Sequence, residues 1–233
     1  IFRNIAFCKK DILEHRPDAL ILVDYPGLNL RIAKWAKQQG IRVFYYISPT
    51  IWAWHESRVN TVKENVERMF VILPFEKAVY AKHHYEVDYF GHPLADIIDA
   101  AKANMISRGD FLKKHGLPDK PIITLMPGSR NQEIKYKLPE MLKVIKHFPN
   151  HQFVISGTAA FGENFKDMIN GFDVKVVSND TYALMHHSQA GLVKSGTSVL
   201  EAALLNMPQA LVYKGNPLTV QAARWLSKVK WIG

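Results

Sequence analysis

The segment IITLMPGSR, residues 122–130, decides the fold of this chain. It opens with an apolar run as long as a buried strand, and the small-residue turn PGSR leads into a helix-like stretch. The segment AGLVKSGTSVLE, residues 190–201, repeats this order of strand, turn and helix. In a parallel sheet such turns lie at the carboxyl ends of the strands, where α/β proteins bind ligands. The pair therefore predicts a Rossmann-like α/β domain with a ligand site at that edge.

Both turns have features that suit a phosphate. Free backbone N–H groups and the positive end of the following helix attract anions. Arg130 adds a planar, permanently charged fork that matches a diphosphate. Glu201 lies one turn into its helix, within reach of ribose hydroxyls. Together these residues predict a nucleotide-sugar site that has no Walker lysine.

Composition sets broad limits on the class of protein. With 233 residues and 48% hydrophobic content, the chain can form two modest domains or one large one. Cys8 is the single cysteine, which excludes an intrachain disulfide and is weakly typical of a reducing compartment. No apolar stretch of these residues is long enough to span a bilayer, and we expect no signal peptide among them.

The net charge of +9 is unevenly distributed. Residues 1–101 contain 13 Lys/Arg and 12 Asp/Glu, whereas residues 102–233 contain 17 and 9. A basic excess suggests a polyanionic partner such as a nucleotide diphosphate, an anionic lipid or a nucleic acid. Charge alone favours the simpler interpretation of a solvated basic surface.

Strand-like and helix-like runs alternate along the chain and predict parallel βαβ units in each half. We place a domain junction near residue 101, in a polar and charged region. The predicted strands are residues 18–23, 41–47, 68–73, 87–90, 121–126, 151–156, 174–177, 189–193 and 209–213. The predicted helices are 28–39, one that opens at residue 74, 106–115, 131–147, 161–170, 180–187, 197–206 and 217–229.

Asp24 is the candidate catalytic residue of the first half. It ends a buried strand in the segment VDYPGLN, residues 23–29. A carboxylate at that edge can accept a proton from a hydroxyl nucleophile. It can equally serve as the N-cap of the following helix, because Asp favours such positions. The residues themselves leave both interpretations open.

The loop SPTIWAW, residues 48–54, is unusual in placing two tryptophans around one alanine after a strand. Trp52 and Trp54 can form a sugar-stacking wall or can simply cover an edge of the core. His92 follows a strand and can orient a substrate or make a structural hydrogen bond. The paired histidines at 83–84 and 186–187 lack the spacing of a zinc helix, so we expect no metal site.

Several segments taken together resemble the lipid-A-disaccharide synthase family, bacterial glycosyltransferases of the GT-B type. Each segment alone is weak, but they follow the family order over nearly the whole chain. The matching segments are VDYPGLNL (23–30), YISPTIWAW (46–54), ILPFE (72–76), GHPLAD (91–96), PGSR (127–130), SGTSVLE (195–201) and PLT (217–219).

The resemblance implies an α/β fold of two Rossmann-like domains facing a cleft. Residues 1–101 are then a truncated acceptor-side domain and residues 102–233 the UDP-sugar domain, incomplete at its carboxyl end. The implied reaction joins UDP-2,3-diacylglucosamine to 2,3-diacylglucosamine 1-phosphate by an inverting β-1,6 transfer. It requires no cofactor, no metal and no nucleic acid. The implied location is cytoplasmic, with peripheral contact on the anionic inner membrane.

The resemblance also assigns roles to residues of this sequence. Asp24 becomes the catalytic base. The expected UDP-binding residues are Gly128, Ser129, Arg130, Ser195, Gly196, Thr197 and Glu201. The residues expected in the acceptor cleft are Asn29, Ser48, Trp52, Trp54 and His92.

The chain departs from the family pattern at Gly27, where many members have a second Asp, which leaves Asp24 as the sole candidate base. We expect the chain to be incomplete at both ends and inactive by itself. Another GT-B protein is an alternative, either an undecaprenyl-linked N-acetylglucosaminyltransferase or a UDP-sugar 2-epimerase. A non-catalytic basic module that binds nucleotides or nucleic acid is a further alternative.

Overall fold

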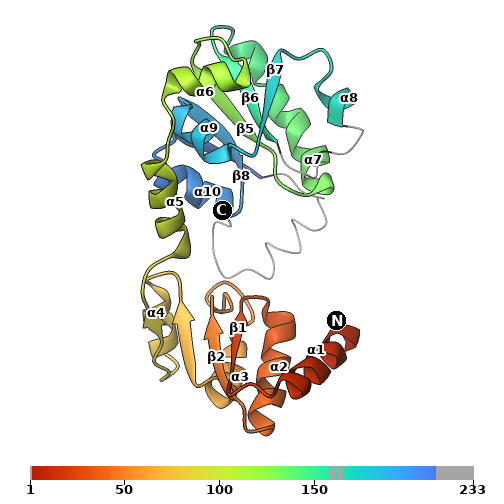
Figure 1. Cartoon of the computed structure of the whole chain (residues 1–233), viewed down its shortest axis with the longest axis vertical. Coiled ribbons are helices and arrows are strands. Elements are labelled where there is room, and N and C mark those ends of the chain that lie inside the picture. Colours follow the sequence, from red (N-terminus) through yellow and green to blue (C-terminus); the bar gives the residue numbers. More distant parts are fainter. Residues whose placement is uncertain (1, 158–160, 162–164, 214–233) are drawn as a thin grey trace. The chain divides into compact units, whose positions relative to one another are not determined.

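The structure is a computed structural model that describes residues 2–157, 161 and 165–213. The described chain divides into two compact units, residues 2–93 and residues from 94 onward (Figure 1). The junction expected at residue 101 falls inside helix α5 (Pro93–Ala103), which the sequence did not predict at these bounds. The two units are described one after the other.

The first unit is built on a parallel sheet with the strand order β1-β2-β3-β4. The register pairs Val23 with Tyr46 and Tyr46 with Phe70, so the strands end at one common edge. All four strands lie within the predicted segments. Their bounds are β1 (Ala19–Val23), β2 (Arg42–Tyr46), β3 (Arg68–Val71) and β4 (Asp88–Tyr89). The helices are α1 (Phe2–His15), α2 (Pro26–Gln38), α3 (Arg58–Asn65) and α4 (Glu76–Ala81).

Two helices of the first unit were missed because few of their apolar side chains form a buried stripe. In α1, Ile5, Cys8 and Ile12 pack against the core, whereas Phe7 and Leu13 are exposed. In α3 the buried apolar positions are Val59 and Val62. Their helical spacing is correct, but each stripe is too short to predict a helix from the pattern alone.

The second unit contains a parallel sheet with the strand order β7-β6-β5-β8-β9. The chain passes outward from β5 to β6 and β7, then crosses to the other side of β5 and continues with β8 and β9. The direction of winding therefore reverses between β5 and β8, which is the point where open α/β sheets bind ligands. The strands are β5 (Ile122–Met126), β6 (Gln152–Gly157), β7 (Val174–Ser178), β8 (Ala190–Lys194) and β9 (Gln209–Val212).

Alternate residues of the central strands face two separate apolar clusters. Ile123 and Leu125 pack in one cluster with the buried side of α7. Ile122 and Val154 pack in the other cluster with residues of α6 and α9. The sheet is thus covered on both faces, which explains why β5 is buried at every position. This confirms the predicted α/β class.

The helices of the second unit follow the predicted positions with shifted ends. The helix expected at 131–147 ends at Leu142, and a 3-10 turn, η1 (Ile145–His147), follows it. The helix expected at 161–170 is shorter, and the one at 217–229 lies outside the described residues. The helices besides α5 are α6 (Arg108–His115), α7 (Asn131–Leu142), α8 (Phe165–Ile169), α9 (Thr181–His187) and α10 (Thr197–Leu204).

Candidate functional site

Asp24 lies directly after β1 in a strained turn. Its φ is +46° and that of Tyr25 is +43°, so two consecutive residues with side chains adopt the left-handed conformation. Such a conformation costs roughly 1–3 kcal/mol per residue and persists only where the surroundings enforce it. Here the Asp24 N–H donates to the Tyr46 carbonyl at 2.9 Å. The turn is therefore held from the neighbouring strand.

The carbonyl oxygen of Asp24 is fixed by two side chains. The Tyr45 hydroxyl donates to it at 2.6 Å, and the Asn29 amide donates to it at 2.6 Å. The same amide also donates to the Val23 carbonyl at 2.9 Å. Burial, and then the nearby Asp24 charge, raise the pKa of Tyr45, so its hydroxyl stays a donor at neutral pH. Asn29 therefore supports the turn, whereas its sequence-based assignment was to the acceptor cleft.

The carboxylate of Asp24 is exposed. The N-cap of α2 is Tyr25, and no side chain caps that helix end. The interpretation of Asp24 as a helix cap is therefore wrong. What remains is a carboxylate presented to solvent at the carboxyl end of β1 by a strained backbone. That arrangement can accept a proton from a bound hydroxyl group.

Ser48 is buried after β2, and its hydroxyl donates to Glu76 Oε1 at 2.6 Å. Glu76 is also buried, and its Oε2 accepts the backbone N–H groups of Ile72 at 3.2 Å and Leu73 at 2.9 Å. Glu76 opens α4, two residues after the predicted start at residue 74, and it also joins the ends of β2 and β3. Ser48 thus serves this internal network and does not present its hydroxyl to solvent.

The two tryptophans of the 48–54 loop differ in their surroundings. Trp52 packs edge-on against Phe75, with ring centroids 5.2 Å apart. Trp54 is 48% exposed, and its indole N–H donates to the Thr50 hydroxyl at 3.0 Å. Trp52 therefore covers part of the core edge, while Trp54 remains open to a ligand. His92 is half-buried, immediately before α5.

In the second unit both predicted turns meet at the switch point of the sheet. Gly128 has a φ of +118° and Gly196 a φ of +148°, conformations that disfavour side chains. Gly196 is also the N-cap residue of α10. A pocket of about 440 Å³ lies between the turns. Its lining residues are Met126, Gly128, Ser129, Ser156, Thr181, Tyr182, Lys194, Thr197, Ser198 and Glu201.

This pocket gathers four of the seven residues that were expected to bind UDP: Gly128, Ser129, Thr197 and Glu201. Ser195 and Gly196 lie between its lining residues Lys194 and Thr197. The remaining residue, Arg130, is not among the lining residues. Its side chain is 82% exposed, and its Nη1 lies 3.8 Å from Glu133 Oε1. Arg130 therefore lies outside the pocket lining, with its guanidinium largely exposed to solvent beside Glu133.

The pocket wall formed by β6, α9 and α10 is polar, and its side chains are hydrogen-bonded to one another. The Tyr182 hydroxyl donates to Glu201 Oε1 at 3.1 Å, and burial followed by the Glu201 charge raises the pKa of Tyr182. Ser156 and Thr181 share a hydrogen bond of 2.9 Å between their hydroxyls. Tyr182 thus orients the carboxylate that was expected to bind ribose.

Sequence reasoning missed several members of this site. Glu133, three positions after Arg130, accepts the Ser129 N–H at 3.3 Å and forms an ion pair with Lys194. A glutamate at the third position of a helix is a known capping signal and could have marked it. Tyr182 and Ser156 carry no such local signal, because only the fold brings β6, α9 and α10 together.

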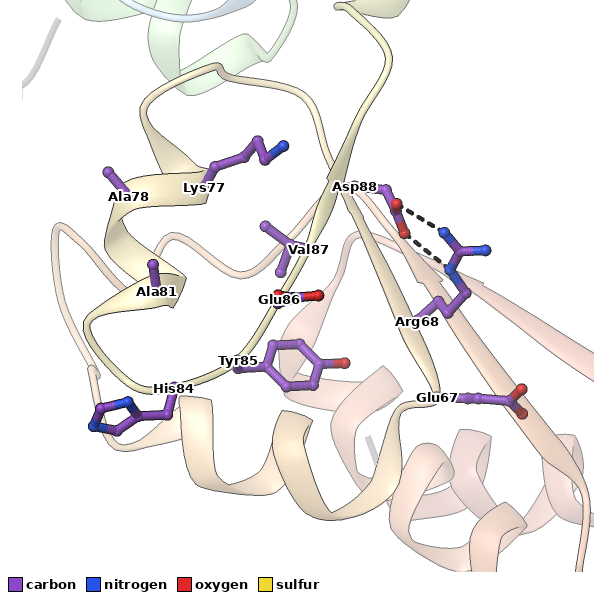
Figure 2. Close-up of a pocket in the computed structure, with 10 residues that line it drawn as sticks. All are labelled: Glu67, Arg68, Lys77, Ala78, Ala81, His84, Tyr85, Glu86, Val87 and Asp88. Atoms are coloured by element: carbon purple, nitrogen blue, oxygen red, sulfur yellow. Dashed lines mark hydrogen bonds and ion pairs between the residues drawn. The ribbon is translucent and has the colours of Figure 1, made fainter.

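A larger cavity of about 960 Å³ lies elsewhere in the first unit. It opens at the amino ends of β3 and β4, the sheet edge opposite Asp24. Figure 2 shows α4 on one side and the Arg68–Asp88 ion pair, at 2.8 Å, on the other. Size alone does not make this cavity the site, because the candidate catalytic residue lies at the other end of the strands.

Over the described residues, no group of three or more His, Cys, Asp or Glu side chains is arranged to hold a metal ion. In the same part of the chain, no helix combines the length and the apolar character needed to cross a membrane.

Comparison with known families gives a match over residues 2–233 to the family described as lipid-A-disaccharide synthetase. A lipid-A-disaccharide synthase of Coxiella burnetii (strain Dugway 5J108-111) is 39% identical over 225 residues. That alignment covers 93% of this chain and 58% of the relative. Lipid-A-disaccharide synthase 1 of Legionella pneumophila (strain Lens) is 40% identical, with 100% of this chain and 62% of the relative covered. The chain thus spans about three fifths of the length of these relatives.

Solved structures resemble this chain at lower sequence identity. The UDP-GlcNAc 2-epimerase of Neisseria meningitidis bound to UDP-GlcNAc aligns with a TM-score of 0.66 and 16% identity. The alignment covers 94% of this chain and 66% of the epimerase. The calicheamicin glycosyltransferase CalG4 aligns with a TM-score of 0.53 and 14% identity, over 89% of this chain and 59% of that structure. At this identity the likeness supports the fold alone.

Proposed function

The chain belongs to the lipid-A-disaccharide synthetase family, and we propose that the whole protein is the corresponding glycosyltransferase. It joins UDP-2,3-diacylglucosamine to 2,3-diacylglucosamine 1-phosphate and releases UDP and lipid A disaccharide 1-phosphate. The observation that carries this proposal is the pocket at the β5/β8 switch point, where both turns meet Glu201. We assign donor binding to residues 102–233 and the acceptor side to residues 1–101.

In this proposal the second unit binds the donor. The N–H groups of the turn at 195–197 face the diphosphate, and Arg130 swings in from solvent to contact it. In the turn at 127–130 the Ser129 N–H is held by Glu133. Glu201, oriented by Tyr182, accepts hydrogen bonds from the ribose hydroxyls. As the bond to the sugar breaks, negative charge grows on the departing UDP. Donors already in place stabilise that charge without reorganisation.

The first unit supplies the base. Asp24 takes the proton of the acceptor 6-hydroxyl, and the oxygen attacks the anomeric carbon of the donor. The bond between that carbon and the β-phosphate oxygen breaks, and its electron pair leaves with UDP. One such displacement inverts the configuration and yields the β-1,6 bond. Trp54 and His92 are placed beside the acceptor, while Asn29 acts by holding the Asp24 turn.

We further propose that the whole protein is cytoplasmic and contacts the anionic inner membrane peripherally. The support is the basic excess of residues 102–233 and the acyl chains of both proposed substrates. Sedimentation with vesicles should then depend on anionic lipid and weaken with salt. Equal binding to neutral vesicles would contradict this membrane contact.

The test of the proposed reaction is to supply the whole protein with UDP-2,3-diacylglucosamine and the monosaccharide 1-phosphate. We expect a disaccharide 1-phosphate by mass and a β-linkage by NMR. An α-linkage would overturn the single displacement. No disaccharide, with epimerisation of UDP-N-acetylglucosamine instead, would place the protein among the epimerases. Oligonucleotide binding without UDP binding would indicate a nucleic-acid module.

A further inference from the structure

Lys194 ends β8 and lines the pocket between the two turns. Its Nζ lies 3.1 Å from Glu133 Oε1, and both side chains are largely buried, at 23% and 16% exposure. Glu133 also accepts the Ser129 N–H. The ion pair therefore links the turn after β5 to the end of β8, across the switch point of the sheet.

The glycines of both turns leave room for this ion pair. A Cβ at Gly128 would overlap Glu133 Oε2. A Cβ at Gly196 would lie 2.9 Å from Lys194 Nζ. Each turn thus needs glycine for its backbone conformation and also for the close approach of one member of the pair.

The cations around Glu133 outnumber its single negative charge. Arg130 approaches the same carboxylate at 3.8 Å. Lys137 lies one helical turn further along α7 and is only 7% exposed. No hydrogen bond or ion pair joins its ammonium to any described residue. Burial lowers the pKa of Lys137, Glu133 opposes this shift, and the charge of Lys194 adds to it. Three cations thus stand near one carboxylate, and the net positive charge of this cluster is suited to a further anion.

We propose that Lys194 binds a phosphate group of the nucleotide-sugar donor and that Glu133 positions its ammonium. The inference rests on the proposed function and adds a contact that the sequence did not assign. An ammonium has three donors, so Lys194 can keep its bond to Glu133 while it donates to a phosphate oxygen. No proton is transferred. The ammonium stabilises the negative charge that UDP acquires as it leaves.

The first test measures binding of uridine, UMP and UDP to the whole protein by calorimetry. Lys194→Met keeps the length of the side chain and removes the charge. We expect UDP affinity to fall about ten- to hundredfold, the range for a lost hydrogen bond to a charged group. Uridine affinity should stay unchanged, because the nucleoside has no phosphate. The matched control is Lys143→Met at the C-cap of α7, where the lysine side chain is 66% exposed and pairs with Glu140.

The second test uses Glu133 to separate phosphate binding from a structural role. In Lys194→Met the Glu133 carboxylate is left beside the diphosphate without the Lys194 ammonium between them, and the two negative charges repel. We therefore expect the double variant Lys194→Met/Glu133→Gln to bind UDP more tightly than Lys194→Met alone. If the pair served only to hold the turns together, the double variant would bind no better than the single one.

Three results would overturn this inference. UDP affinity could be unchanged in Lys194→Met, uridine affinity could fall as much as UDP affinity, or the double variant could fail to recover UDP binding. In each case the native protein still binds UDP, so the proposed function would stand. If the native protein itself binds no UDP, the proposed function fails and this inference fails with it.

Discussion

The two units use the same architecture to present opposite charges. In each, a parallel sheet ends in turns that carry the candidate residues. At the edge of the first unit an exposed carboxylate, Asp24, stands in a left-handed turn that lacks glycine. At the edge of the second unit, glycines occupy the left-handed positions and cations surround Glu133.

The difference points to a division of labour. Forcing Asp24 and Tyr25 into a costly conformation fixes the direction of a single reactive group. Glycine turns cost less strain and allow backbone N–H groups and ammonium groups to approach a ligand closely. The first edge is suited to proton transfer and the second to holding an anion. Substitutions at the first edge should therefore affect turnover, and substitutions at the second edge should affect UDP affinity.

The largest expected effect is that of Asp24→Asn. The amide keeps the shape of the side chain but cannot act as a base, so the rate of disaccharide formation by the whole protein should fall ~10²–10⁴-fold. Initial rates at saturating substrates measure this loss. Nearly normal turnover would show that the strained carboxylate of the first unit has no chemical role.

A smaller effect is expected for Arg130→Ala in the second unit. Its guanidinium contacts charge both before and during bond breaking, so UDP affinity and turnover should fall together. A lost hydrogen bond to a charged group costs about 1.5–3 kcal/mol. Calorimetry with UDP checks this, with Arg3→Ala as the control, since Arg3 is exposed on α1. Unchanged affinity would remove Arg130 from the site.

Asn29→Ala should act on turnover without affecting nucleotide binding. The variant loses the hydrogen bonds to the carbonyls of Val23 and Asp24, each contributing about 0.5–1.5 kcal/mol. We expect a several-fold slower rate, because the Asp24 turn can relax from its strained conformation. A fall in UDP affinity with unchanged turnover at saturation would contradict the assignment of Asn29 to the catalytic edge of the first unit.

The smallest expected effect is a difference in pH sensitivity between the units. In the first unit, burial raises the pKa of Tyr45 and Tyr80, and raises that of Tyr85 to about 12. Unfolded tyrosines ionise near 10.0. Above that pH the unfolded chain loses protons that the folded unit retains, so the stability of the first unit should fall as the pH rises toward 12.

The second unit should lose stability in acid through Asp180. Although burial opposes the shift, hydrogen bonds from Lys114 and His115 hold the pKa of Asp180 below its usual value of 3.8. Its contribution is present above that value and is lost as the pH falls through the folded pKa. Urea unfolding at several pH values, with Tyr85→Phe and Asp180→Asn as probes, checks the expected loss of stability in alkali and the expected loss in acid. A Tyr85→Phe variant with undiminished alkaline sensitivity would contradict the assignment to the first unit.

The sequence predicted the sheets well because their strands are apolar runs bounded by turns, as in 122–126. It predicted both turns of the second unit from their glycines and from Arg130. It could not predict the positive φ of Asp24 and Tyr25, because that conformation is enforced by Tyr45 and Asn29.

Contacts between segments that are distant along the chain could not be predicted from the sequence either. The partner of Ser48 is Glu76, and the partner of Glu133 is Lys194. Neither pairing is encoded in a local pattern, since each depends on which strands are neighbours in the sheet. The family resemblance assigned Ser48 to the acceptor cleft, whereas its buried hydroxyl donates to Glu76.

The division of labour is tested most directly by one measurement, the calorimetric UDP affinity of the whole protein carrying Asp24→Asn. The nucleotide is bound by the second unit alone in this account, so the variant should bind UDP as tightly as the native protein. A loss of UDP affinity as large as that of Arg130→Ala would contradict the account, because Asp24 would then belong to the anion site.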